Sequence, residues 1–171
     1  TTSNIPELVT VANLLKKQWG TLGVDVSIKS LGPVELQQAL KDRDYQALLF
    51  GEILGLDPEP SSFWHSSQKR DPGLNLALYE NKNANKILED TREILDQKER
   101  FARYAKLQDI ILADAPAVFL YSPDYVYGHS GALKTFISPI IAMPADRYET
   151  ISRWYINTTR VFQKPTADKY K

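Results

Sequence analysis

The fold class is decided by residues 6–50, which read PELVTVANLLKKQWGTLGVDVSIKSLGPVELQQALKDRDYQALLF. Apolar side chains recur at helical spacing over residues 8–22, so the stretch begins with a helix. Residues 24–28 alternate apolar and polar side chains, as a strand with one buried face does. A second helix is predicted at 33–40 after a Gly-Pro turn, and the apolar run at 45–50 is typical of a buried strand. This order predicts an α/β fold with a mixed, mostly parallel sheet flanked by helices.

Length, charge and cysteine content limit the classes of function. A chain of 171 residues suits one domain with a single core. Its 21 Lys and Arg residues balance its 21 Asp and Glu residues, so there is no overall field to attract nucleic acid, and we expect no nucleic-acid partner. The absence of cysteine excludes disulfides and thiolate metal sites. No apolar stretch reaches the roughly 20 residues that a membrane-spanning helix needs.

The segment 51–73 is the candidate ligand-binding loop. It is rich in Pro, Gly and Ser, begins at the carboxyl end of the second predicted strand, and is too long for a simple connector. Ligands of open α/β sheets bind at this end of the strands. Its ring side chains are Phe63, Trp64 and His65. We expect Phe63 or Trp64 to form an apolar wall and Glu52 or Asp57 to supply a charged group, whereas the alternative is that the aromatic residues pack in the core.

Two helices are predicted after this loop, at 83–95 and 97–113, from the spacing of their apolar residues. Asp96 followed by Glu99 forms the capping-box pattern at the start of the second helix. The charged residues of both helices lie four apart and are interpreted as solvated helix faces, so we assign them no chemistry.

The last third of the chain has a weaker pattern. Residues 117–121 and 125–127 are predicted strands. Tyr121, at the end of the first, is a further candidate ligand contact, whereas the alternative is that it packs on a half-buried strand face. One weak helical stretch is predicted near 147–154. The apolar residues after Tyr127 expose more apolar surface than an isolated tail should, so we expect something to cover them.

Catalytic motifs are mostly absent. The sequence has no glycine-rich phosphate loop, no G-x-S-x-G elbow and no H-E-x-x-H helix. Its two histidines lie far apart and do not favour a shared metal site, so we expect neither a metal nor a cofactor. Glu52 with Asp57 or Glu59 could in principle act as a general acid and base, as in a glycosidase. A hydrolase that uses these acids is therefore an alternative, although acids beside prolines and glycines more often form turns and pocket walls.

Several local motifs, taken in order, match one protein family. They are LLKKQW at 14–19, GVDV at 23–26, DYQALL at 44–49, DPEPSSF at 57–63, RFARY at 100–104 and LQDIILADAP at 107–116. The chain resembles the carboxy-terminal lobe of family 5 extracellular solute-binding proteins, the oligopeptide, dipeptide and nickel receptors of bacterial ABC importers. The resemblance spans about residues 5–125.

The resemblance implies a binding protein rather than an enzyme, built as one lobe of a type II periplasmic-binding-protein-like fold. Its ligand would be an oligopeptide or a similar small solute, and its partners would be ABC permease subunits. It would work outside the cytoplasm, in the periplasm or anchored by lipid at the cell surface, with the signal and anchor absent from this chain. A receptor of the same fold that senses a solute without importing it is an alternative.

The resemblance also implies a domain organisation. Residues 1–124 would form the carboxy-terminal ligand-binding lobe with its first strand truncated, and Ser122–Asp124 would be the hinge. Residues 125–171 would be the hinge return and tail, packed on an amino-terminal lobe of the same protein that is missing from this chain. Apolar residues such as Phe136 and Trp154 would then be covered by that lobe.

Peptide-binding relatives carry a tryptophan and then an aspartate in the loop after the buried strand, and the aspartate pairs with the amino group of the peptide. Aligning backward from the sequence PSSF at 60–63 places Ile53 at the tryptophan position and Leu56 at the aspartate position. Asp57 is one residue away. A one-residue shift to Asp57, an alternative anion at Glu52, and a ligand without a free amine all remain open.

Overall fold

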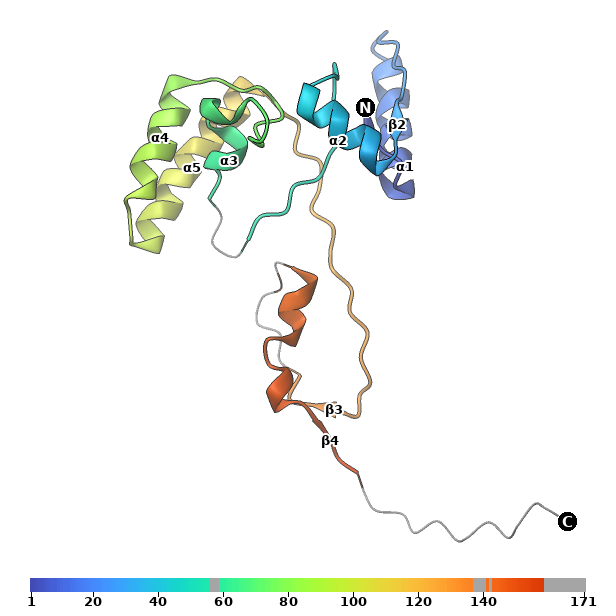
Figure 1. The fold of residues 1–171 in the computed structure, drawn as a ribbon, viewed down its shortest axis with the longest axis vertical. Coiled ribbons are helices and arrows are strands. Elements are labelled where there is room, and N and C mark those ends of the chain that lie inside the picture. Colours follow the sequence, from blue (N-terminus) through green and yellow to red (C-terminus); the bar gives the residue numbers. More distant parts are fainter. Residues whose placement is uncertain (56–58, 137–140, 142, 159–171) are drawn as a thin grey trace, which may run out of the picture. The chain divides into compact units, whose positions relative to one another are not determined.

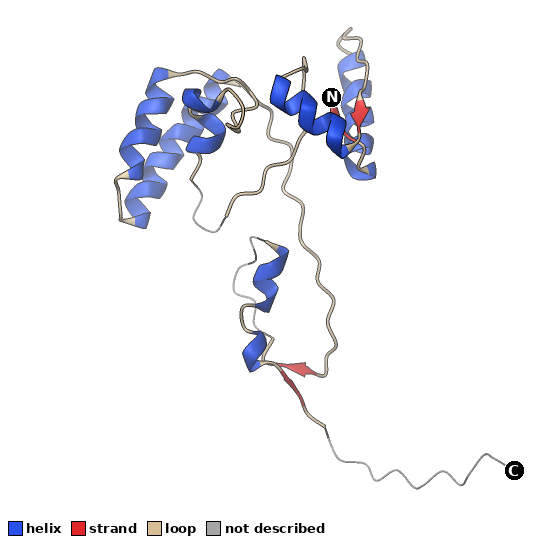
Figure 2. Cartoon of the chain, viewed as in Figure 1, coloured by secondary structure: helices blue, strands red, loops and turns tan. Residues whose placement is uncertain are grey.

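The computed structural model describes residues 1–55, 59–136, 141 and 143–158. The chain divides into two compact units, residues 1–120 and residues 121–171. Figure 1 traces the chain by colour, and Figure 2 shows that helices predominate and that the strands are short. Within the described residues, none of the helices combines the length and the apolar character that a membrane crossing requires.

A short parallel sheet begins the first unit. Strand β1, Thr2–Ser3, pairs with strand β2, Ser30–Leu31, in parallel. Thr2 lies opposite Ser30 in this pair and also forms an isolated parallel bridge with Leu49. The three segments therefore run in one direction, as the predicted helix and strand order requires.

Proline begins both helices that flank this sheet. Helix α1 spans Pro6–Gly20 and helix α2 spans Pro33–Asp42. Proline has no backbone N–H, and in the first turn this loses no hydrogen bond because N–H groups there have no partner inside the helix. Both helices contact β1. Ala12 of α1 and the pair Leu36 and Ala39 of α2 are buried. The two helices predicted from apolar spacing are thus confirmed.

The strand predicted at 24–28 is wrong in its position. These residues form no ladder, and pairing starts only at Ser30. Because Ser30 already lies opposite Thr2 in the parallel pair, residues 24–28 extend beyond the end of β1, and no described residue pairs with them. The predicted alternation is nevertheless present, since Val26 and Ile28 are half-buried while the residues beside them are exposed.

The strand predicted at 45–50 is reduced to the single bridge at Leu49. The backbone N–H of Leu49 donates to the Thr1 carbonyl at 2.9 Å, and the amino group of Thr1 donates to the Ala47 carbonyl at 2.8 Å. Strand β1 has only two residues, so most of the run at 45–50 has no partner with which to form a ladder.

The rest of the first unit is helical. Its segments are α3 (Ser61–Trp64), the 3-10 helix η1 (Ser66–Gln68), α4 (Lys82–Arg92) and α5 (Gln97–Asp114). Helices α4 and α5 pack side by side, and α3 packs on α4 (Figure 1). The two long helices match the predicted ones within a few residues at their ends.

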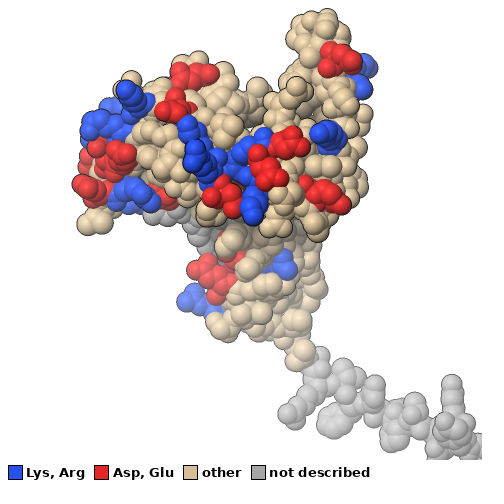
Figure 3. Space-filling view, turned by 45° about the horizontal axis from the view of Figure 1, so that its top comes forward, with Lys and Arg blue, Asp and Glu red and all other residues tan. Residues whose placement is uncertain are grey.

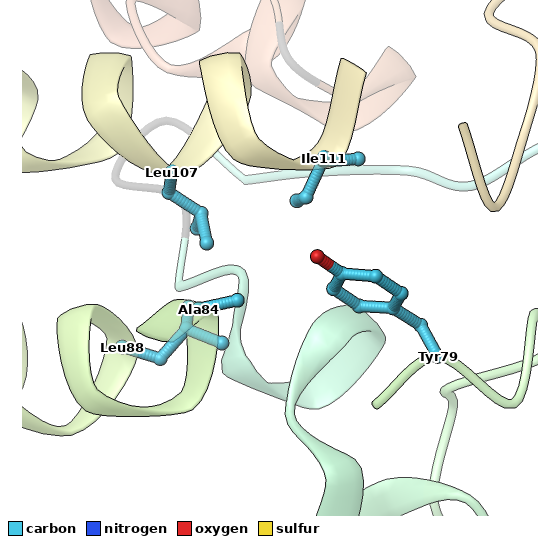
Figure 4. Packing of buried hydrophobic residues seen from close by; sticks show 5 residues of the cluster. All are labelled: Tyr79, Ala84, Leu88, Leu107 and Ile111. Carbon is cyan, nitrogen blue, oxygen red and sulfur yellow. The ribbon is translucent and has the colours of Figure 1, made fainter. Parts of the chain in front are cut away.

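The core of this helical part is a cluster of five buried side chains, Tyr79, Ala84, Leu88, Leu107 and Ile111. Figure 4 shows Leu107 and Ile111 of α5 pointing toward Ala84 and Leu88 of α4 and toward the Tyr79 ring. Leu88 is only 1% exposed. Burial of this apolar surface is the main term that holds the helix pair together.

Side-chain caps fix where the two long helices begin. The Asn81 side chain accepts hydrogen bonds from the backbone N–H groups of Asn83 at 2.8 Å and Ala84 at 3.1 Å. The Asp96 carboxylate accepts from the backbone N–H of Glu99 at 2.7 Å, as the capping-box pattern predicted. Each cap satisfies donors that the first helical turn leaves free.

Arg43 and Tyr45 join the sheet-bearing part of the first unit to the loop before α4. Arg43 ends α2 with a left-handed backbone (φ +56°), and its guanidinium donates to the carbonyls of Lys69 at 3.2 Å and Gly73 at 2.7 Å. The Tyr45 hydroxyl donates to the Leu76 carbonyl at 2.7 Å. These three bonds hold residues 69–76 against the end of α2.

The strands predicted at 117–121 and 125–127 are wrong. Residues 117–127 have no ladder partner within the described residues. Apolar and β-branched residues favour an extended backbone, but a strand also requires a neighbouring strand with matching backbone groups.

The second unit contains a short antiparallel sheet and two 3-10 helices. Strand β3 (Leu133–Lys134) pairs with strand β4 (Tyr155–Ile156), and helices η2 (Pro144–Tyr148) and η3 (Ile151–Arg153) lie between them in sequence. The weak helical stretch predicted near 147–154 is therefore present as 3-10 turns.

Aromatic side chains pack together inside the second unit. Phe136 lies edge-on to Trp154 with 5.1 Å between ring centroids, and the Arg147 guanidinium lies 4.4 Å from the Tyr148 ring centroid and 5.0 Å from that of Tyr127. Phe136 and Trp154, which were predicted to be covered by another lobe, thus contact each other. That another lobe also covers this unit stays a prediction.

Candidate ligand-binding site

The predicted ligand-binding loop is only partly irregular. Residues 51–55 belong to no helix or strand and are exposed. Leu56 and Asp57 lie outside the described residues. From Ser61 onward the loop forms α3 and η1, so its aromatic residues stand on helical turns rather than on an irregular segment.

Glu52 and Ile53 are the described residues of the exposed stretch that sequence reasoning assigned to the site. Ile53 is 74% exposed, which suits a side chain that has no contact inside the first unit. Glu52 also keeps an exposed surface, yet partial burial raises the pKa of its carboxyl to about 7. Burial raises a carboxyl pKa because the charged form loses hydration.

Trp64 packs against the helical core. Its ring lies edge-on to Tyr79 with 6.1 Å between centroids and 5.9 Å from Phe119. It is half-buried, as is Phe63. The packing that was weighed as the alternative for these rings is therefore observed for Trp64, and a further contact of either ring with ligand stays a prediction.

His65 is held by hydrogen bonds at both ring nitrogens. Its Nδ1 accepts from the backbone N–H of Ser67 at 3.2 Å and lies 2.7 Å from the Ser67 hydroxyl. Its Nε2 lies 3.0 Å from Glu89 Oε1 on α4. A backbone N–H can only donate, so Nδ1 is the acceptor. The ring proton is therefore on Nε2, which donates a hydrogen bond to the Glu89 carboxylate.

Asn75 supports this arrangement and was missed by sequence reasoning. It is fully buried, and its side-chain amide donates to the carbonyls of His65 at 3.1 Å and Tyr79 at 2.9 Å. The sequence holds one signal of this role, a polar residue inside the apolar run 74–79, LNLALY. A buried polar side chain in such a run must find partners, and these are usually backbone groups.

One of the acids considered for a hydrolase, Glu59, lies beside helix α4. Glu59 Oε1 lies 3.5 Å from Arg92 Nε on α4, so this carboxylate has a cationic partner. Asp57 lies outside the described residues. Tyr121, the other predicted contact, is exposed and is the first residue of the second unit. The described residues contain no cluster of three His, Asp or Glu side chains that could hold a metal ion.

Charged side chains of both signs intermix on the face of the first unit drawn in Figure 3. Ion pairs within helices account for part of this mixing: Lys86 Nζ lies 3.1 Å from Asp90 Oδ2 on α4, and Arg103 lies 3.8 Å from Glu99 on α5. Pairs of this kind on exposed helix faces contribute little to stability. They agree with the prediction that these faces are solvated.

The chain is similar in sequence to two binding proteins. It is 28% identical over 116 residues to the oligopeptide-binding protein AppA of Bacillus subtilis, a match that covers 67% of this chain and 21% of AppA. It is 25% identical over 137 residues to the probable D,D-dipeptide-binding periplasmic protein DdpA of Escherichia coli, covering 78% of this chain and 26% of DdpA. The chain therefore spans about a quarter or less of the length of these relatives. No family model matches it.

Solved structures show the same relationship. The structure of Bacillus subtilis AppA with a nonapeptide matches 92% of this chain and 31% of that chain with a TM-score of 0.70 and 23% identity. The ABC transporter substrate-binding protein CtaP of Listeria monocytogenes matches 67% of this chain and 24% of that chain with a TM-score of 0.58 and 31% identity. CtaP is an ABC transporter substrate-binding protein, and AppA and DdpA are an oligopeptide-binding protein and a probable D,D-dipeptide-binding protein. The predicted resemblance and the predicted fold class are thereby confirmed, although the described strands are shorter than expected.

Proposed function

We propose that this chain is the ligand-binding lobe of a peptide-binding protein that serves an ABC importer. The observation that carries the proposal is the combined sequence and structural similarity to AppA, an oligopeptide-binding protein whose structure holds a nonapeptide. The chain spans less than a third of that structure, so a second lobe of the same protein would supply the other side of the site. The periplasmic relative DdpA supports a location outside the cytoplasm, and the partners would be permease subunits.

Glu52 is the described group best suited to hold a peptide amino group. It stands on the exposed stretch after the Leu49 bridge, beside the exposed Ile53, where open α/β sheets bind ligands. An ammonium ion beside this carboxyl favours its charged form and so lowers the pKa that partial burial has raised. Binding near pH 7 should therefore release part of a proton from Glu52.

Calorimetry on the whole receptor tests this assignment. A peptide with a free amino terminus and its N-acetylated form are titrated in buffers of different ionisation enthalpy at pH 7. Release of about half a proton is expected with the free peptide, because a carboxyl with a pKa near the working pH is about half protonated. Glu52→Gln should abolish this release and weaken binding, whereas Glu93→Gln on the exposed end of α4 should change neither.

Two outcomes would contradict the proposal. Peptide binding that is absent from the whole receptor at all lengths tested would remove the function itself. Peptide binding that Glu52→Gln leaves unchanged would keep the function and remove Glu52 as the anchor.

A hydrolase remains the second candidate because of one observation. A carboxyl with a pKa of about 7 is what a general acid near neutral pH requires. Mass spectrometry of the peptide after incubation separates the two functions. Cleavage that Glu52→Gln abolishes, in a variant that stays folded, would favour the enzyme.

A further inference from the structure

A polar cavity of about 210 Å³ lies between α3, η1 and α4. Its lining includes two hydroxyl groups of α3, at Ser61 and Ser62, and Glu89 and Arg92 one turn apart on α4. It is built from residues that the proposed function does not use, apart from His65. The volume suits a small group, such as the end of a chain, rather than a whole peptide.

Glu89 is the charged acceptor in the lining of this cavity. Glu89 Oε1 accepts a hydrogen bond from the Nε2–H group of His65, which leaves the second carboxylate oxygen of this exposed side chain for another donor. His65 is neutral in this geometry, because its Nδ1 accepts the backbone N–H of Ser67. The Glu89 charge is therefore hydrogen-bonded but not balanced by the imidazole.

Ser61 supplies a second, independent observation. It is only 5% exposed, and its hydroxyl has no hydrogen-bond partner among the described residues. A buried hydroxyl without a partner is costly, and such groups in native structures call for an explanation. A donor group bound in the cavity would give this oxygen a partner.

The charges around the cavity favour a cation. Among the described lining residues Arg92 is the one lysine or arginine, and its Nε lies 3.5 Å from Glu59 Oε1. With His65 neutral, the two carboxylates at Glu59 and Glu89 exceed the single guanidinium by one negative charge. An anion at Arg92 would be repelled by the carboxylates of both Glu59 and Glu89.

We propose that the cavity between α3 and α4 binds a primary ammonium group, with Glu89 as its ionic partner and the Ser61 and Ser62 hydroxyls as neutral acceptors. An ammonium group donates three hydrogen bonds and accepts none, which matches the unused acceptors of this lining. The inference goes beyond the proposed function, because it needs neither a second lobe nor a transporter.

The test uses three small probes of the same length on the 171-residue chain: butylammonium chloride, sodium butyrate and butan-1-ol. Proton–nitrogen correlation spectra report the Gln68 side-chain amide and the Ser62 backbone N–H, both of which belong to the cavity lining. Butylammonium should shift these signals saturably, and the two other probes should not. Equal shifts from butanol, or shifts from butyrate alone, would overturn the proposal.

Three variants test whether negative charge at the cavity strengthens butylammonium binding. Glu89→Gln should weaken butylammonium binding by about tenfold, since hydrogen bonds to charged groups are the stronger class. Asp90→Asn removes the same charge from the neighbouring exposed position of α4 and should leave binding unchanged. Arg92→Gln removes a repulsive cation and should tighten binding, so a loss of binding in this variant would overturn the ammonium assignment.

Peptide probes distinguish two sources of the ammonium group, a peptide amino terminus and a lysine side chain. A tetra-alanine with a free amino terminus, its N-acetylated form, and an N-acetylated tetra-alanine with one lysine are compared in the same spectra. Shifts with the first peptide alone identify a peptide amino terminus, and shifts with the lysine peptide identify a side-chain amine. Absence of shifts with all three, together with no response to butylammonium, would overturn the proposal while leaving peptide binding by the whole receptor untouched.

Discussion

Asn75 and Tyr79 exchange two hydrogen bonds inside the first unit. The Asn75 side-chain amide donates to the Tyr79 carbonyl at 2.9 Å, and its side-chain oxygen accepts from the Tyr79 backbone N–H at 2.9 Å. Both residues are buried, and Tyr79 is the ring on which Trp64 packs. The position of Trp64 in the candidate loop thus depends on Asn75, a polar residue that is fully buried.

Replacing Asn75 should unfold the first unit more easily. Asn75→Ala leaves the Tyr79 backbone N–H buried without a partner, and we expect a loss of about 2–3 kcal/mol in the free energy of unfolding. Urea unfolding followed by circular dichroism measures the change. Asn83→Ala, at an exposed position of α4, is the matched control and should stay within about 0.5 kcal/mol of wild type. Equal stability of the two variants would show that the Asn75 bonds have no net value.

Two leucines in and after α4 test the helical core. Leu88 is buried between α4 and α5, whereas Leu95 is 93% exposed. We expect Leu88→Ala to lower the free energy of unfolding by about 3 kcal/mol, because it removes buried methyl groups and leaves a cavity. Leu95→Ala should change it little. Similar losses in both variants would mean that Leu95 is covered in solution.

Local signals in the sequence predicted the helices well because each helix satisfies its own backbone. Pro6 and Pro33 mark two helix starts and Asp96 caps a third, and none of these features depends on distant residues. The strands were predicted less well, since residues 24–28 need partners that none of the described segments supplies. The resemblance rested on motif order, and this was enough to identify the homologues.

The candidate site was predictable in its location but not in its detail. The aromatic triplet after the second strand drew attention to the loop, yet the sequence does not show that His65 bonds to Glu89, 24 residues away. Arg43 was also missed, because its role depends on the carbonyls of Lys69 and Gly73, which only the fold brings to it. Long-range polar contacts of this kind have no periodicity to reveal them.

The boundary between the two units should be the first site of proteolysis. Residues 117–127 have no ladder within the described chain, and Tyr125 is 44% exposed there. Phe101 is similarly exposed, at 47%, but lies in the second turn of α5. Proteases bind their substrates in an extended conformation, which a helix cannot adopt without local unfolding. Chymotrypsin should therefore cut after Tyr121 or Tyr125 well before it cuts after Phe101.

Mass spectrometry of a time course identifies the first fragments. A first product ending at residue 121 or 125 agrees with the predicted hinge at Ser122–Asp124. First cleavage within α4 or α5 would show that the helical part, rather than the segment between the units, is the least stable region. In the whole receptor the same segment should become protected if a second lobe covers it.

Glu52 makes the stability of the first unit depend on pH in a defined direction. Partial burial raises the pKa of its carboxyl to about 7, above the value of about 4.3 expected in an unfolded chain. The folded state therefore binds the proton more tightly than the unfolded state. The resulting stabilisation is fully present below about pH 4.3 and is lost as the pH rises through 7.

Glu52→Gln replaces the carboxyl with a neutral group of the same shape and should remove this dependence. We expect the variant to be more stable than wild type at pH 8 and closer to it at pH 5, as measured by the difference in Tm between the two proteins at each pH. Glu35→Gln, an exposed acid in the first turn of α2, provides the control for a lost surface charge. A Tm difference for Glu52→Gln that stays constant from pH 5 to pH 8 would mean that the Glu52 carboxyl titrates as in the unfolded chain. That result would also remove the proton release expected when a peptide amino group binds to Glu52, because a carboxyl already ionised at pH 7 has no proton to give up.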